Sequence, residues 1–114
     1  MATNGIEAVF LETHNWGAAA KFFQRLGYVL EFDTGHGSGQ LRNGDGPYVF
    51  VAEVPADQPT STRIVFGVDG ADVLGEGDGL DVVQGFEPTH WGTQEAVVRD
   101  PDGRLFSLQT PPGS

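Results

Sequence analysis

Few residues of this chain carry the side chains that catalysis or metal binding requires. There is no cysteine, so disulfides, thiolate metal sites and a cysteine nucleophile are excluded. The three histidines, His14, His36 and His90, fall in a cap region and in two turns, and they are not spaced as a helical pair of ligands. Ser107 has no histidine and carboxylate at a readable spacing, and no glycine-rich loop follows a strand and opens a helix. The residues themselves therefore indicate no catalytic site.

The segment 104–110 presents the most informative polar residues. Ser107 and Gln109 alternate with Phe106 and Leu108, so the two pairs lie on opposite faces of a predicted strand. The apolar pair is expected to pack against a helix, and the polar pair to form a small, uncharged wall.

Aromatic walls with a few polar groups are typical of small-molecule sites. Trp91 follows a turn, where its indole face could close over a planar or cationic ligand. Phe10 and Phe50 would equally fill a core, and Glu12 and Arg63 would equally pair across adjacent strands. The predicted ligand-binding residues are Phe10, Glu12, Tyr48, Phe50, Arg63, Trp91, Ser107 and Gln109.

The elements that must position these residues follow one order twice. Asn15 is a good N-cap for a helix and Gly27 a natural stop. A second helix is expected to be short, because interior glycine costs about 1 kcal/mol relative to alanine and the segment 69–79 is rich in it. The predicted segments are strand 6–12, helix 16–27, strands 28–33, 40–44 and 47–55, linker 56–61, and strands 62–68, 80–88, 93–100 and 104–110.

This order predicts a single α+β domain over residues 1–114, with two βαβββ modules at 1–55 and 62–114. The shortened second helix is expected to leave sheet surface thinly covered at Ile64, Phe66, Phe106 and Leu108. The segment "DPDG" at 100–103 predicts a tight turn. Pro101 sets φ at its second position, Asp100 accepts from backbone amides, and Gly103 takes a positive φ.

Composition and charge exclude several partners. Hydrophobic residues make up 39% of the chain, enough to fill a core, and the net charge of −10 repels phosphate backbones. The same charge would attract cationic small molecules or basic proteins. The start has no signal-peptide pattern, and no apolar run approaches the roughly 20 residues that span a bilayer. We expect a soluble, cytoplasmic protein with no nucleic-acid or membrane partner.

Two stretches at this spacing resemble the vicinal oxygen chelate superfamily, which comprises glyoxalases, bleomycin-resistance proteins and ring-cleaving dioxygenases. They are "FFQRLGY" (22–28) and "WGTQEAVVRDPDG" (91–103). The resemblance covers nearly the whole chain, and it implies curved mixed sheets around a cup. Metal-using members take ligands from the first, fourth, fifth and eighth strands, typically histidine and glutamate.

The equivalent positions here carry poor ligands. The first-strand position falls on Ala8, the fifth on Arg63 or Ile64, and the eighth on Ser107. The fourth lies among Tyr48, Phe50 and Ala52, and register slips would offer Glu7 or Glu53, the former on the opposite face. A neutral methyl, a cation and a hydroxyl do not make a metal site of nitrogen and oxygen donors.

The resemblance is therefore to the metal-free, bleomycin-resistance-like branch. It implies a homodimer without a cofactor that sequesters an antibiotic or a similar cationic or aromatic ligand. An alternative is a metal-independent isomerase, cyclase or lyase of the same fold, with Glu12 as base and Arg63 as oxyanion partner. A third is an interaction module without a ligand.

Overall fold

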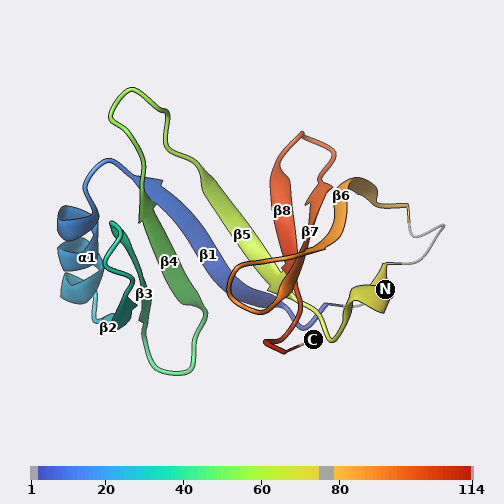
Figure 1. The fold of residues 1–114 in the computed structure, drawn as a ribbon, viewed down its shortest axis with the longest axis horizontal. Helices are drawn as coiled ribbons and strands as arrows, with labels where there is room; N and C mark the ends of the chain where they lie inside the picture. The colour runs from blue at the N-terminus through green and yellow to red at the C-terminus, as the bar shows by residue number, and fades with distance from the viewer. Residues whose placement is uncertain (1–2, 75–78, 114) are drawn as a thin grey trace. The chain divides into compact units, whose positions relative to one another are not determined.

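The computed structural model describes residues 3–74 and 79–113, and their helix and strands follow the predicted order (Figure 1). The elements are β1 (Ile6–Thr13), α1 (Trp16–Arg25), β2 (Val29–Asp33), β3 (Ser38–Arg42), β4 (Tyr48–Glu53), β5 (Thr62–Gly67), the 3-10 turn η1 (Ala71–Val73), β6 (Asp81–Pro88), β7 (Gln94–Arg99) and β8 (Leu105–Gln109).

The chain forms two compact units. The N-terminal unit comprises Ala8–Arg63, and the C-terminal unit comprises the residues before Ala8 together with those from Ile64 on. Hydrogen-bonded strands follow the order β2-β3-β4-β1 in the first unit and β5-β8-β7-β6 in the second. In each unit the first strand runs parallel to the fourth, and the remaining pairs are antiparallel. The predicted α+β architecture with a repeated strand order is confirmed.

Helix α1 begins at the predicted residue, Trp16, and ends at Arg25, two residues before the predicted end. The Asn15 side chain accepts a hydrogen bond from the Ala18 amide at 3.0 Å, and Gly27 has φ +96° just beyond the last turn. The apolar face of the helix packs on Leu41, Val49 and Val51, which form the core of the N-terminal unit. This packing leaves the alternate side chains of β1, β3 and β4 on the opposite face of the sheet.

Strand β3 begins at Ser38, two residues earlier than the sequence indicates. Gly39 belongs to the strand because the Trp16 indole lies directly on its backbone. A Cβ atom at Gly39 would stand 2.6 Å from the indole ring and 2.7 Å from the Phe32 carbonyl oxygen. Glycine at this position is thus required for close packing of the helix on the sheet.

The core of the C-terminal unit forms on the predicted face of β8. Leu108 packs with Val68, Ala96 and Val98, and Phe106 lies against the same cluster. The covering element is η1 and the residue after it, Val73 and Leu74, rather than an α-helix. Leu108 is only 3% exposed, so the expectation that it is thinly covered is wrong. Residues 75–78 of the predicted short helical segment lie outside the described residues.

The turn between β7 and β8 has the predicted construction. Asp100 Oδ1 accepts from the amides of Asp102 (2.9 Å) and Arg104 (2.8 Å), and Gly103 has φ +86°. The Arg104 guanidinium also donates to Asp100 Oδ2 at 2.7 Å. The turn fixes the register in which Ser107 and Gln109 share one face of β8.

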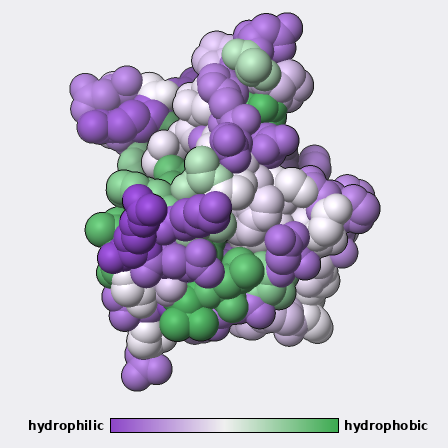
Figure 2. All heavy atoms as spheres, turned by 90° about the vertical axis from the view of Figure 1, so that its left-hand side faces the viewer, coloured by the Kyte–Doolittle hydropathy of each residue, from purple (hydrophilic) through white to green (hydrophobic). Residues whose placement is uncertain are grey.

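Several large apolar side chains remain at the surface. On α1 and at the start of β2, Phe22, Leu26 and Val29 are 57%, 56% and 66% exposed. Figure 2 looks onto this side and shows apolar surface gathered among polar groups. On β6, Val82 and Val83 are 42% and 46% exposed. No helix in the described residues is long and apolar enough to cross a membrane.

Candidate functional site

The N-terminal unit presents aromatic rings on the face of its sheet that α1 does not cover. Phe10 and Phe50 are neighbours across β1 and β4, with ring centroids 5.8 Å apart and planes 10° from parallel. Phe32 lies 6.3 Å from Phe50 and is 47% exposed. Val49 and Val51 face the helix, so Tyr48 and Phe50 belong to this open side. We call it the aromatic face: Phe10, Phe32, Tyr48 and Phe50, with Gln40 and Arg42.

A polar cluster borders these rings. The Arg42 guanidinium lies over the Tyr48 ring, 5.2 Å from its centroid. Glu31 accepts from Gln40 Nε2 at 2.9 Å and from Arg42 Nε at 3.2 Å. The Gln40 hydrogen bond, with the Arg42 charge, holds the pKa of Glu31 below its ordinary value of 4.5. Glu31 therefore stays ionised at neutral pH and pins Arg42 beside the aromatic rings.

The C-terminal unit presents a smaller polar face on β8. Ser107 is 1% exposed and lies between Val65 and Val97 in the strand register. Its hydroxyl makes no hydrogen bond within residues 3–74 and 79–113. Among these residues, every side-chain nitrogen or oxygen atom that is fully enclosed has a hydrogen-bond partner. The Ser107 hydroxyl is therefore barely exposed rather than fully enclosed.

A chain of hydrogen bonds crosses the same face. Trp91 Nε1 donates to Gln109 Oε1 at 3.0 Å, and Gln109 Nε2 donates to Glu7 Oε2 at 2.6 Å. Gln109 is 7% exposed, whereas Trp91 is 59% exposed. Glu95 is the cross-strand neighbour of Gln109, so it lies on this face too. We call Glu7, Trp91, Glu95, Ser107 and Gln109 the polar face.

Sequence comparison places the chain with one bacterial relative. No family model matches. An uncharacterized protein of Mycolicibacterium smegmatis is 30% identical over 118 residues, covering 97% of each chain. The chain belongs to the same family as this protein, whose name states no activity.

Solved structures supply the fold. A glyoxalase/bleomycin resistance protein/dioxygenase superfamily member from Vibrio splendidus superposes with a TM-score of 0.69 at 16% identity, covering 91% of this chain and 97% of its own. The halotolerant catechol dioxygenase BphC superposes with a TM-score of 0.68 at 16% identity, covering 95% of this chain and 39% of its own. The chain has the glyoxalase/bleomycin resistance/dioxygenase fold.

Within this fold, the positions expected to hold a metal carry no ligand set. Ala8 is buried on β1 at 1% exposure, and Ser107 lies between two valines. His14 Nε2 is 2.7 Å from the Gln58 carbonyl oxygen, to which a ring N–H can donate. In the described part of the chain, no three histidine, aspartate or glutamate side chains are placed to hold a metal ion.

The two predicted charged residues do not meet. Glu12 Oε1 accepts from both the amide (3.0 Å) and the hydroxyl (2.8 Å) of Ser61, fastening the segment that enters β5. Arg63 is half-buried and makes no side-chain hydrogen bond or ion pair with any described residue. The hydrogen bonds to Ser61 give Glu12 a structural role.

Sequence reasoning missed several residues of these faces. Gln40 and Arg42 are recoverable from alternation around the buried Leu41. Glu31 and Phe32 both reach the aromatic face because the β2–β3 register shifts between Leu30 and Phe32. No local sequence pattern predicts this shift. Glu7, which alternation places on the opposite face from Ala8, accepts a hydrogen bond from Gln109 through its carboxylate.

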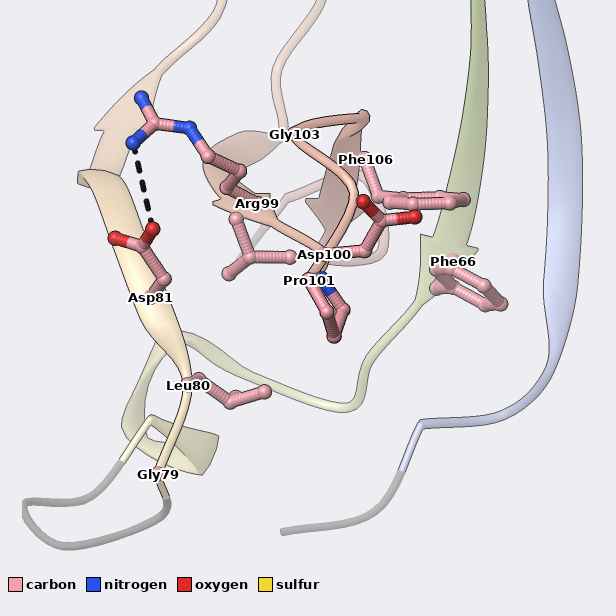
Figure 3. A pocket seen from close by; sticks show the side chains of 10 residues that line it. Phe66, Gly79, Leu80, Asp81, Arg99, Asp100, Pro101, Gly103 and Phe106 are labelled. Atoms are coloured by element: carbon pink, nitrogen blue, oxygen red, sulfur yellow. Dashed lines mark hydrogen bonds and ion pairs between the residues drawn. The ribbon is translucent and has the colours of Figure 1, made fainter.

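A groove on the other side of β8 was also not predicted. Its volume is about 710 Å³, and its walls all come from the C-terminal unit (Figure 3). Phe66 and Phe106 are among its apolar lining residues. Its two carboxylates are already ion-paired, Asp81 to Arg99 at 3.3 Å and Asp100 to Arg104 at 2.7 Å. The groove therefore offers apolar area and little unmatched charge.

Proposed function

We propose that this protein binds a small molecule without a metal and sequesters an antibiotic or a similar cationic or aromatic ligand. The aromatic face carries the proposal. Phe10, Phe32 and Phe50 lie close together on the side of the sheet away from the core, and none of them is fully buried. Ring surface left open in this way gains free energy when a planar ligand covers it, about 25 cal/mol per Å² of apolar area.

The C-terminal unit offers candidate ligand contacts of its own. The Ser107 hydroxyl has no hydrogen-bond partner among the described residues, and Trp91 is 59% exposed. Open aromatic rings with a few polar groups beside them, here Gln40 and Arg42 of the N-terminal unit, are the usual composition of small-molecule sites. The Vibrio structure of the same fold is described with bleomycin resistance proteins, which supports the choice of antibiotics as first ligands.

The metal-free part of the proposal depends on residue chemistry. Ala8 has no donor atom, Arg63 is a cation, and Ser107 is a neutral hydroxyl flanked by valines. Divalent metals favour carboxylate or imidazole donors. Ligand recognition would then depend on stacking and hydrogen bonds alone.

Titration of the purified protein with bleomycin and a panel of cationic or aromatic antibiotics tests the proposal. Calorimetry is expected to give saturable binding to one or more of them. Phe50→Ala is expected to weaken binding at least about tenfold, because aromatic contacts are worth about 0.5–1.5 kcal/mol beyond the area they bury. Phe22→Ala is the matched control, since Phe22 lies on the exposed side of α1.

Two results would reject the proposal. The first is an absence of binding across the panel. The second is equal loss of binding in Phe50→Ala and Phe22→Ala, which would place the ligand outside the aromatic face.

We also infer that the protein forms a homodimer. Apolar side chains remain exposed on both units, at Phe22, Leu26 and Val29 and at Val82 and Val83. A small domain gains most from covering such surface. Strand β6 ends the strand order of its unit, so its backbone is also available for pairing.

A further inference from the structure

We propose that Trp91 is a fixed platform for a planar cationic group of the ligand, and that Gln109 and Glu7 are the residues that position it. The inference rests on the proposed function in taking the ligand to be a small molecule. It goes further by assigning the charge and shape of the group that is recognised. All three residues belong to the C-terminal unit.

The hydrogen-bond chain has one consistent direction. An indole N–H can only donate, so the oxygen of the Gln109 amide must face Trp91 and its nitrogen must face Glu7. The measured distances, 3.0 Å and 2.6 Å, agree with that orientation. Because Gln109 is 7% exposed, its amide is held in place, and it holds the indole edge in turn.

Gly67 makes the chain possible. Gly67 is the β5 neighbour of Gln109, and both its N–H and its C=O are bonded to residues just before Glu7. A Cβ atom at Gly67 would lie 3.3 Å from Glu7 Oε1, so the carboxylate passes over a position without a side chain. The Glu7 carboxylate can therefore reach Gln109 across an intervening strand.

The platform leaves its ring faces available. The only polar atom of the Trp91 side chain is engaged, yet 59% of the residue is exposed. An indole that is fixed at one edge loses little further conformational freedom when a ligand stacks on it. Ser107, two residues from Gln109 on the same face of β8, adds a hydroxyl that has no hydrogen-bond partner among the described residues.

Charge selects a cation for this position. The residues before Ala8 and from Ile64 on include ten acidic and two basic residues. Both arginines are committed, Arg99 to Asp81 and Arg104 to Asp100 and Asp102. Glu7 and Glu95 flank Gln109, and the face of an indole attracts cations through its quadrupole. An anionic ligand would find no unpaired arginine or lysine in this unit.

Three isosteric probes test this directly: benzamidinium, benzamide and benzoate differ in charge but share one planar shape. The chain has two tryptophans, so a ¹H–¹⁵N spectrum shows two indole N–H signals, which Trp91→Phe assigns. Benzamidinium is expected to shift the Trp91 signal and to bind at least about threefold more tightly than benzamide. Benzoate is expected to leave it unmoved. The Trp16 signal, held by Asp33, reports that the N-terminal unit is intact.

Two variants separate positioning from charge. Gln109→Met keeps the side-chain length but removes both hydrogen bonds, so the Trp91 N–H signal should move and both benzamidinium and benzamide should weaken at least about threefold. Glu7→Gln keeps an acceptor for Gln109 but removes the charge. It should leave the Trp91 N–H signal in place and abolish the preference for benzamidinium over benzamide.

The outcomes are distinct from those of the antibiotic titration. Equal binding of benzoate and benzamidinium, absence of any shift at Trp91, or unchanged binding in Gln109→Met would each overturn this inference. Antibiotic binding that persists in Trp91→Phe would overturn it while leaving the proposed function standing. Selective benzamidinium binding without antibiotic binding would support this inference and reject the sequestration of antibiotics.

Discussion

The two units repeat one strand order but cover their sheets differently. In the N-terminal unit a ten-residue helix packs its apolar face on β3 and β4, with Trp16 seated on Gly39. In the C-terminal unit a three-residue turn and Leu74 cover the same side. The comparison shows that a short apolar cap is enough to bury Leu108, provided the strand register brings Phe66 and Phe106 against it.

The units also differ in charge and in the surface opposite the core. The N-terminal unit has six acidic and four basic residues, and its open face is aromatic. The C-terminal unit carries ten acidic and two basic residues, and the side of β8 away from its core is polar, with Ser107 and Gln109 buried and Trp91 exposed. One unit thus offers stacking surface, and the other offers negative charge with hydrogen-bonding groups.

The largest expected effect is a doubling of the mass in solution. Light scattering at micromolar concentration should give twice 12.2 kDa if the exposed apolar residues of the two units are covered by a second copy. Val83→Lys on β6 should favour the monomer, because it places a charge within apolar contact area. Leu26→Lys introduces the same charge on α1 of the other unit. The variant that lowers the mass shows which unit's exposed apolar residues the second copy covers. A wild-type mass near 12.2 kDa would refute the dimer.

A substitution at Gly39 should have the next largest effect. Gly39→Ala is expected to destabilise the protein by about 3 kcal/mol, because its Cβ would meet both a ring and a backbone carbonyl that cannot yield. Gly85→Ala is the control from the C-terminal unit, where nothing lies within 4 Å of the added atom. Urea denaturation of both variants measures the difference. Equal stability would show that the helix does not depend on this close approach.

A smaller expected effect is the loss of stability at low pH, which should have a different cause in each unit. The Gly35 amide and the Trp16 indole lower the pKa of Asp33 below 3.8, whereas Arg104 is the main cause of the lowered pKa of Asp100. In both cases the ionised carboxylate is favoured in the folded state. Its stabilisation is present above the ordinary pKa of 3.8 and is lost as the pH falls below it.

Thermal melts between about pH 6 and about pH 3 test this expectation. The difference in Tm between wild type and either variant, Asp33→Asn or Asp100→Asn, should become smaller as the pH falls. Added salt should reduce this difference for Asp100, whose partner is a charge, more than for Asp33, whose partners are neutral N–H groups. A difference that grows in acid would contradict the assignment of either carboxylate.

Much of the fold was predictable because its signals are local. Asn15 caps the helix by accepting from an amide three residues along the chain, and Gly27 follows the helix end with a positive φ. Asp100 accepts from an amide four residues along the chain and so organises its turn. Alternation placed Phe106 and Leu108 on the core side of β8. Glycine content predicted that the second helix would be short, and η1 agrees. In each case the interacting groups are close in the chain, so residue type and spacing suffice.

The sequence by itself determined the order of elements, the strand faces and the excess of negative charge. Only the tertiary structure decided which side chains meet. Glu7 and Gln109 are 102 residues apart, and their contact depends on Gly67 leaving room on a third strand. Gly39 lies outside the predicted strand 40–44, and only its contact with the Trp16 ring explains why a glycine is needed there. Such contacts depend on register and close packing between distant segments, for which a residue's neighbours in sequence carry no signal.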